Sequence, residues 1–163
     1  MREILFRGKS VIPQDILEDM GISLENGWVY GSYVDGFIIS EVVDATDMYI
    51  TIGRWCKVDP ETVGQYTGLT DKNGQKIFEG DVVQAVSKIV TLSGVDTGGS
   101  CRQVYEVVWN DGCWSRIKTY DSLWSSQDVI KTTPTKIYPD LAAKFYEVIG
   151  NVHDNPELLE VGE

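Results

Sequence analysis

The sequence is poor in the residues that most often bind metals or act as general bases. It has one histidine, His153, and three cysteines, Cys56, Cys101 and Cys113, which share no metal-like spacing. Zinc sites draw mainly on these two residue types, so we predict no metal site, and nothing in the sequence indicates a cofactor. No serine or cysteine near His153 in the sequence is placed to act as its nucleophile. We therefore expect a protein that is not an enzyme, with an unrecognised small enzyme as an alternative.

Long apolar runs are also absent. No segment approaches the roughly 18 apolar residues of a membrane-spanning helix. The first seven residues, Met1–Arg7, mix charged and apolar side chains and contain no signal-peptide core. We expect a cytoplasmic protein that has no membrane partner.

Positive charge is scarce: 14 lysines and arginines face 25 aspartates and glutamates, giving a net charge of −11. A negative field opposes the phosphate backbone, so nucleic acid is an unlikely partner. Only residues 113–146 carry more basic than acidic side chains, five against three. Two alternatives stay open: nucleic-acid binding through that segment, and mimicry of nucleic acid by the acidic side chains.

Aromatic residues and glycines are plentiful, with five Trp, eight Tyr and 16 Gly, and they favour strands and tight turns. Residues 1–63 predict an N-terminal β-meander lobe with one short helix over Val11–Gly21. Asn26-Gly27 and Asp35-Gly36 predict hairpin turns between its strands. The fold class is therefore mainly β with minor α.

Residues 63–83, VGQYTGLTDKNGQKIFEGDVV, form the most distinctive stretch of the chain. Strand-forming residues follow its glycines, whereas a phosphate-binding loop would lead into a helix. Glu79 and Asp81 could form an acid–base pair on one strand face, or a turn that accepts backbone N–H groups, and we favour the turn. We predict that the following residues are structural corners: Tyr66, Thr67, Gly68, Leu69, Asp71, Asn73, Gly74, Glu79, Gly80 and Asp81.

Residues 64–154 predict a second lobe, a small SH3-like β-barrel. Its strands include a tight hairpin at Asn110-Asp111-Gly112 and a pairing of residues 81–86 with 146–152. Two polar segments, 87–103 and 119–140, are predicted to be inserted loops. Residues 155–163 predict a short C-terminal helix and tail, which Asn155 caps and Pro156 begins.

Three segments together resemble the YopX family: MREILFRGKS at the start, the 63–83 stretch, and YEVIGNVHDNPELL at 146–159. They occur in the family's order and span nearly the whole chain. The insertion VIPQDILEDM and the long segments at 87–103 and 119–140 depart from the commoner pattern. The resemblance implies a mainly β protein of a phage or prophage, located in the host bacterial cytoplasm. It adds Gly150, Asn151, Asn155 and Pro156 as motif residues and brings no catalytic residue.

Function has to be sought in the aromatic side chains, since seven of them, Trp28, Tyr30, Tyr33, Trp55, Trp109, Trp114 and Trp124, are too many to be buried together. Protein interfaces are enriched in Trp, Tyr and Arg. We predict an interaction surface formed by Trp114, Arg116 and Trp124, with packing of these rings against their own lobe as the alternative. Asp96-Thr97-Gly98 has the letters of an aspartic protease turn, but one copy in a polar segment does not predict that chemistry. The sequence predicts a phage-encoded accessory module that binds a host or phage protein or assembles with itself.

Overall fold

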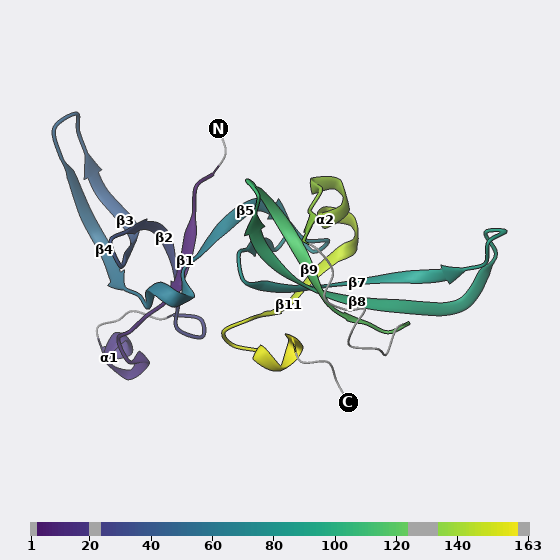
Figure 1. Ribbon diagram of the computed structural model, residues 1–163. Coiled ribbons are helices and arrows are strands. Elements are labelled where there is room, and N and C mark those ends of the chain that lie inside the picture. The colour runs from purple at the N-terminus through teal and green to yellow at the C-terminus, as the bar shows by residue number, and fades with distance from the viewer. Residues whose placement is uncertain (1–2, 20–23, 124–133, 160–163) are drawn as a thin grey trace. The chain divides into compact units, whose positions relative to one another are not determined.

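The computed structural model describes residues 3–19, 24–123 and 134–159. The chain forms two compact units, residues 1–66 and 67–163 (Figure 1). Strands dominate both units, which confirms the mainly β prediction. The predicted lobes divided after residue 63, and the two units divide after Tyr66.

The first unit is an antiparallel sheet with the strand order β4-β3-β2-β1-β5. Its strands are β1 (Phe6–Lys9), β2 (Trp28–Val34), β3 (Phe37–Ala45), β4 (Ile50–Lys57) and the first residues of β5 (Gly64–Thr70). The single helix among its described residues, α1 (Gln14–Asp19), buries Leu17, and the 3-10 turn η1 (Pro60–Thr62) follows β4. Pro13 accepts the backbone N–H of Leu17, so the helix begins next to a proline, as the sequence predicts.

Type I′ turns join the strands where the sequence predicts them. Asp35 and Gly36 have φ of 46° and 85° between the paired residues Val34 and Phe37. Both central residues of a type I′ turn need positive φ, which Asp-Gly tolerates, and its twist matches the strands. The turn thereby fixes which side chains of β3 face the core.

The core of the first unit lies on one face of its sheet. Val29, Ile38, Cys56 and Val58 are buried against one another, with Leu24, Tyr33 and other partly buried residues around them. Arg7 is buried over the Trp28 ring, with its guanidinium carbon 4.7 Å from the ring centroid.

The second unit contains a five-stranded antiparallel sheet with the order β10-β9-β8-β7-β11, and also β6, which neighbours β5 in the other sheet. Its elements after β5 are β6 (Lys76–Phe78), β7 (Asp81–Val90), β8 (Asp96–Asn110), β9 (Cys113–Asp121), β10 (Thr135–Lys136), α2 (Pro139–Phe145), β11 (Tyr146–Asn151) and the 3-10 turn η3 (Pro156–Leu159). The predicted pairing of 81–86 with 146–152 is confirmed, since β11 pairs with β7. Among the described residues, β10 and β11 form the two edges of this sheet and do not pair with each other. The sheet is therefore open, and the closed SH3-like barrel that the sequence predicts is not observed in it.

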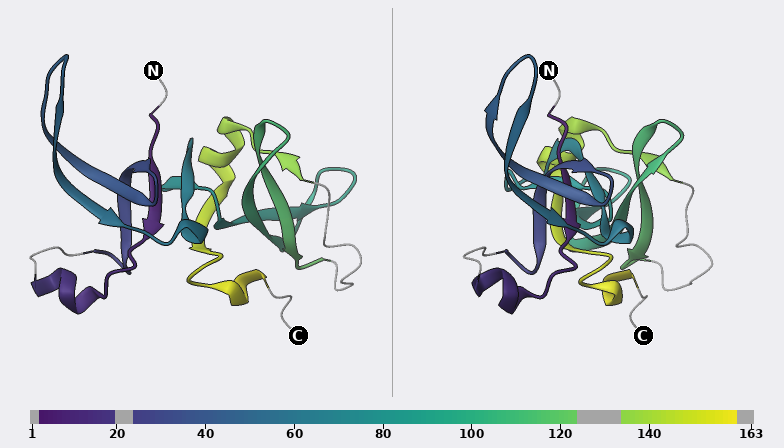
Figure 2. Two further views of the ribbon diagram at one scale, coloured as in Figure 1. Left: turned by 60° about the vertical axis from the view of Figure 1, so that its left-hand side comes forward. Right: turned by 90° about the vertical axis from the view of Figure 1, so that its left-hand side faces the viewer.

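The predicted loop at 87–103 is wrong. Residues 87–90 continue β7 and residues 96–103 belong to β8, with Ser87 opposite Cys101 and only a tight turn between the strands (Figure 2). Here β7 and β8 continue to pair through their backbones beyond the hydrophobic core. Because most side chains in this part face water, they do not alternate between apolar and polar, and the sequence gives no strand pattern. In the predicted 119–140 loop, β9 runs to Asp121 and β10 and α2 begin before residue 140; residues 124–133 lie outside the described part.

The core of the second unit consists of seven buried residues: Ile77, Val83, Tyr105, Val107, Ile137, Ala142 and Tyr146. Tyr105 and Tyr146 lie with ring centroids 6.1 Å apart. No helix in the described residues has the length and apolar character needed to cross a membrane.

Candidate binding surface

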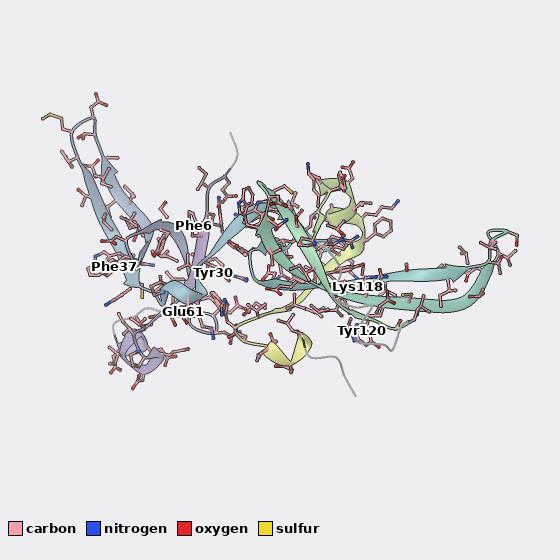
Figure 3. The ribbon with its side chains drawn as sticks, viewed as in Figure 1. Phe6, Tyr30, Phe37, Glu61, Lys118 and Tyr120 are labelled. Atoms are coloured by element: carbon pink, nitrogen blue, oxygen red, sulfur yellow. The ribbon has the colours of Figure 1, made fainter. Side chains whose placement is uncertain are left out.

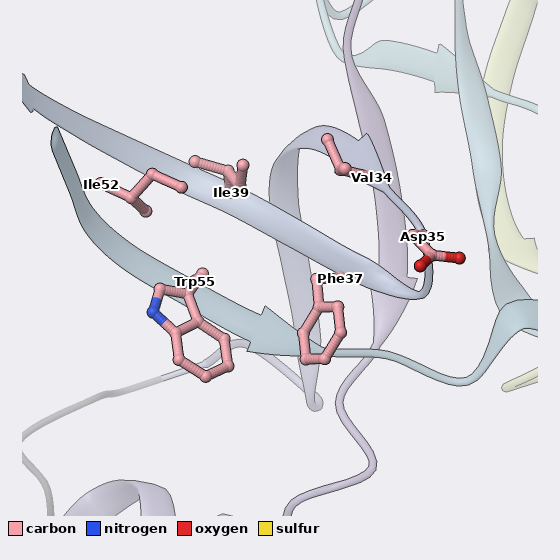
Figure 4. A pocket seen from close by; sticks show the side chains of 6 residues that line it. All are labelled: Val34, Asp35, Phe37, Ile39, Ile52 and Trp55. Carbon is pink, nitrogen blue, oxygen red and sulfur yellow. The ribbon is translucent and has the colours of Figure 1, made fainter. Parts of the chain in front are cut away.

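A groove of about 400 Å³ lies on the first unit, where the β3–β4 hairpin leaves the rest of its sheet (Figure 4). Its lining is apolar apart from one carboxylate, and it consists of Val34, Asp35, Phe37, Ile39, Ile52 and Trp55. The six side chains come from the last residue of β2, the β2–β3 turn, β3 and β4. The groove is therefore a surface feature of three neighbouring strands, covered by protein on one side.

Strand register explains why apolar side chains line it. Ile38 lies opposite Cys56, and both are buried in the core. The next pair, Ile39 and Trp55, points to the other face, because successive strand residues alternate between faces. β3 is therefore apolar on both faces at its base, and only the inner face has a partner in the described core.

Trp55 is the dominant side chain of the groove. Its ring is 59% exposed and packs edge-on against Phe37, with centroids 5.4 Å apart. Phe37 lies at the base of the hairpin (Figure 3). A tryptophan held in place by a second ring but left largely in water is the kind of rigid anchor that protein interfaces use.

Apolar exposure continues from the groove toward the hairpin tip. The exposed apolar residues there are Val42, Val43, Met48, Tyr49 and Ile50. Met48 is 93% exposed, and the Tyr49 hydroxyl donates to Asp44 Oδ2 at 3.1 Å. A group of exposed large apolar side chains on one hairpin is a common feature of interaction sites.

Charge around the groove is mostly negative. The hairpin region from Asp35 to Lys57 carries four carboxylates and two cations. One cation, Arg54, already pairs with Glu41 at 3.3 Å, and both side chains are exposed. Asp35, at the end of the groove, is the sole ionisable residue of its lining.

The predicted corner residue Asp71 shapes the turn between β5 and β6. Its buried carboxylate accepts the backbone N–H groups of Asn73 and Gln75 through Oδ1, at 2.8 and 2.9 Å, and that of Val148 through Oδ2, at 3.1 Å. Asn73 donates its side-chain amide to the same carboxylate, and Gly74 completes the turn with φ of 82°. The Asp71 carboxylate thus ties the turn to β11 within the second unit.

Asp81 does the same for the turn before β7. It is 1% exposed, and its Oδ2 accepts the backbone N–H of Phe78 at 2.7 Å. Gly80 has φ of 77° and donates its N–H to Val107, while Glu79 is half-buried. A carboxylate used in this way shapes a turn, which supports the corner interpretation of the Glu79–Asp81 pair.

The remaining motif residues also serve local structure. Thr67 donates its hydroxyl to the Ile77 carbonyl at 2.7 Å and accepts the Leu69 N–H, and Gly68 between them has φ of 81°. Tyr66, in the first unit, is buried and its N–H donates to the Leu5 carbonyl.

Near the C-terminus, Asn151 Oδ1 accepts the N–H groups of His153 and Asp154. Asn155 accepts the Asn151 N–H, its carbonyl accepts the N–H of Leu158, and Pro156 begins η3. A Cβ at Gly150 would overlap Asn155 Oδ1, so this turn needs the glycine.

The structure places the predicted interaction residues differently from the sequence expectation. Trp114 is 8% exposed, because Trp109 on the paired strand covers it with ring centroids 4.8 Å apart. Arg116 is half-buried, with its guanidinium carbon 4.2 Å from the Tyr105 ring centroid. Trp114 and Arg116 therefore pack against their own unit, and Trp114 cannot provide an exposed surface. Trp124 lies outside the described residues.

Other reactive groups are tied into local structure. Asp96 is exposed and accepts from Lys88 Nζ at 2.7 Å; this contact, followed by the Gly98 N–H, lowers the pKa of its carboxyl group. Cys101 is buried and donates to Asp121 Oδ1, and burial raises the pKa of its thiol. His153 is exposed. Within the described ranges, no group of three or more His, Cys, Asp or Glu side chains is arranged to hold a metal ion.

The groove was not among the predicted sites, although the sequence carries a signal for it. Phe37, Ile38 and Ile39 are consecutive apolar residues in a strand that begins at a tight turn. An antiparallel strand with one wet face should alternate instead. Trp55 belongs to the seven aromatic residues that are too many to be buried together, but nothing in its local sequence distinguishes it from Trp114.

Comparison with known proteins identifies a family and a similar solved structure. The family model described as YopX protein matches residues 23–160. No curated protein matches the chain. The crystal structure of protein EF1440 from Enterococcus faecalis matches at 21% identity over 98% of this chain and 100% of that one, with a TM-score of 0.49.

Proposed function

Because the chain belongs to the YopX family, we propose that it is a phage- or prophage-encoded accessory protein. It acts without catalysis, in the cytoplasm of the bacterial host, by binding another protein through the groove of the β3–β4 hairpin. Phage origin and location are what the family resemblance implies.

The observation that carries the proposal is the exposure of Trp55 in an apolar groove. Leaving an aromatic side chain of this size in water costs far more free energy than leaving a single surface valine there, because more apolar area is exposed. Here it lies in an apolar groove beside a hairpin that carries further exposed apolar side chains, and the described residues of the first unit do not cover it. Burying such a patch against a partner would provide the main driving force for association.

Affinity capture with matched variants tests the proposal. The tagged full-length chain, its Trp55→Ser variant and its Leu92→Ser variant are used to capture proteins from lysate of the bacterium that carries the gene, after nuclease treatment. Leu92 is fully exposed at the end of the β7–β8 hairpin, so it controls for the loss of any exposed apolar side chain. The proposal predicts that wild type and Leu92→Ser retain the same protein and that Trp55→Ser does not. Retention of the same protein by wild type and both variants, or retention of no other protein by wild type, would overturn it.

A further inference from the structure

If the proposed function holds, the groove also indicates what kind of protein segment it binds. We infer that it takes an extended segment of a basic protein, which places a large apolar side chain against Trp55 and a lysine or arginine beside Asp35.

The size and openness of the groove favour a segment of a macromolecule over a free small molecule. Its volume of about 400 Å³ is at the lower end of ligand pockets, which usually enclose most of their ligand. Here the lining comes from three neighbouring strands of one sheet, β2, β3 and β4, and from the β2–β3 turn, so a ligand would contact protein on one side only. A side chain that belongs to a longer segment can bind in such a one-sided groove, because the neighbouring residues of the segment make further contacts along the hairpin and add to the affinity.

Charge selects a basic segment. Asp35 lies at the end of the groove, and residues 1–66 as a whole carry 11 acidic and five basic side chains. Arg54 is occupied by Glu41. Lys57, opposite Phe37 in the register, adds one positive charge at the same end, so the balance of the unit remains negative. A lysine or arginine of the partner would therefore be attracted by the Asp35 carboxylate and by the net negative charge of the first unit. Attraction between oppositely charged proteins also speeds their association.

The same charge argues against a second copy of this chain as the occupant. Each copy carries a net charge of −11, and two acidic hairpins would approach one another in a symmetric pair. The register shifts at Ile39/Glu41, Glu41/Val42 and Val42/Asp44 also disturb the hairpin's pairing. Bulges of this kind are a common protection of exposed strands against self-pairing.

Peptide selection tests the inference. A random peptide library is displayed and selected on the full-length protein, with counter-selection on Trp55→Ser, and the selection is repeated on Asp35→Asn. Asparagine is well tolerated at the positive φ of position 35, so this variant keeps the turn. The expected result is enrichment of sequences that place a lysine or arginine close to a large apolar residue, and loss of that basic preference on Asp35→Asn.

Affinity of the best peptide gives the quantitative arm. Asp35→Asn is expected to weaken binding by roughly two- to fivefold at low salt and to have little effect at high salt, as for an exposed ion pair. Trp55→Ala is expected to weaken it by more than about tenfold. Enrichment of neutral or acidic sequences, unchanged enrichment on Asp35→Asn, or no enrichment over Trp55→Ser would overturn the inference. A dimer in light scattering that Trp55→Ala dissociates would also overturn it, by making a second copy the occupant.

The two proposals fail separately. If Trp55-dependent capture of a protein from lysate succeeds while the selected peptides show no basic preference, the groove binds a protein of other chemistry and only the inference is wrong. If capture does not depend on Trp55, the proposed function is wrong as well.

Discussion

Ile39 and Trp55 lie opposite one another across β3 and β4 on the outer face of the hairpin, one residue away from the buried pair Ile38 and Cys56. Two adjacent apolar pairs therefore have opposite roles. One pair packs in the core, and the other contributes to a groove that faces solvent.

This difference predicts losses of stability of very different size. Ile38→Ala should lower the free energy of unfolding by about 2–5 kcal/mol, because it leaves a cavity in the core. Trp55→Ala should lower it by less than about 1 kcal/mol, since most of the ring is already in water. Urea unfolding followed by circular dichroism measures both. A larger loss for Trp55→Ala than for Ile38→Ala would show that the ring is a core residue.

Asp71 should be needed for the stability of the second unit. Asp71→Ala removes the acceptor of three backbone N–H groups, and hydrogen bonds to a charged group contribute about 1.5–3 kcal/mol each. We expect a loss of at least about 2 kcal/mol in the free energy of unfolding, and a smaller one for Asp71→Asn, which keeps one oxygen. Asp47→Ala, at an exposed position of the β3–β4 hairpin, is the control and should change little. Equal stability of Asp71→Ala and the control would contradict the proposed role.

Asp121 should account for part of the loss of folding stability at low pH. Burial on its own raises the pKa of this carboxyl group, but Lys118, Gln103, the Leu123 N–H and Cys101 together hold the pKa well below its ordinary value. A depressed pKa stabilises the folded state fully above the unfolded value of about 4, and this stabilisation is lost as the pH falls below it.

Thermal melts between pH 7 and pH 2 measure this contribution. Asp121→Asn should melt at a lower temperature than wild type at pH 7, and the gap should narrow below about pH 4. A gap that is constant with pH would mean that the carboxylate charge contributes nothing to stability.

Substitutions of Gly112 should lower the stability through backbone strain alone, without a steric clash. It has φ of 77° in the β8–β9 turn, and a Cβ there would meet no atom within 4 Å. Gly112→Ala should therefore cost about 1 kcal/mol through backbone conformation alone. Gly112→Asn should cost less, because asparagine adopts this conformation more readily. The ratio of the two losses, measured by urea unfolding, checks the turn type; equal losses would contradict it.

Much of the fold is predictable from sequence because its turns are chemically explicit. Asn26-Gly27, Asp35-Gly36 and Asp111-Gly112 all adopt positive φ where the sequence places hairpins. The long-range pairing of β7 with β11 follows from the order of the predicted strands and was also correct. The β7–β8 extension was missed, because Ser87, Lys88 and Ser100 pair through their backbones without burying apolar side chains.

The candidate site was harder to predict than the fold. Trp55 and Trp114 both lie in strands, and only the register decides that Trp114 is covered by Trp109 while Trp55 remains in water. Register depends on which face of each strand the core occupies, and that is a property of the whole sheet. Composition could therefore indicate that some aromatic side chain is exposed, but not which one.

Photo-crosslinking in the bacterial cell tests the central claim most directly. p-Benzoylphenylalanine is placed at Trp55 in one variant and at Leu92 in another, and the cells are irradiated before the tagged chain is purified under denaturing conditions. A binding groove on the β3–β4 hairpin predicts a defined adduct with another protein from position 55 and none from position 92. The absence of an adduct at position 55, an adduct with the chain itself, or the same adducts from both positions would contradict it.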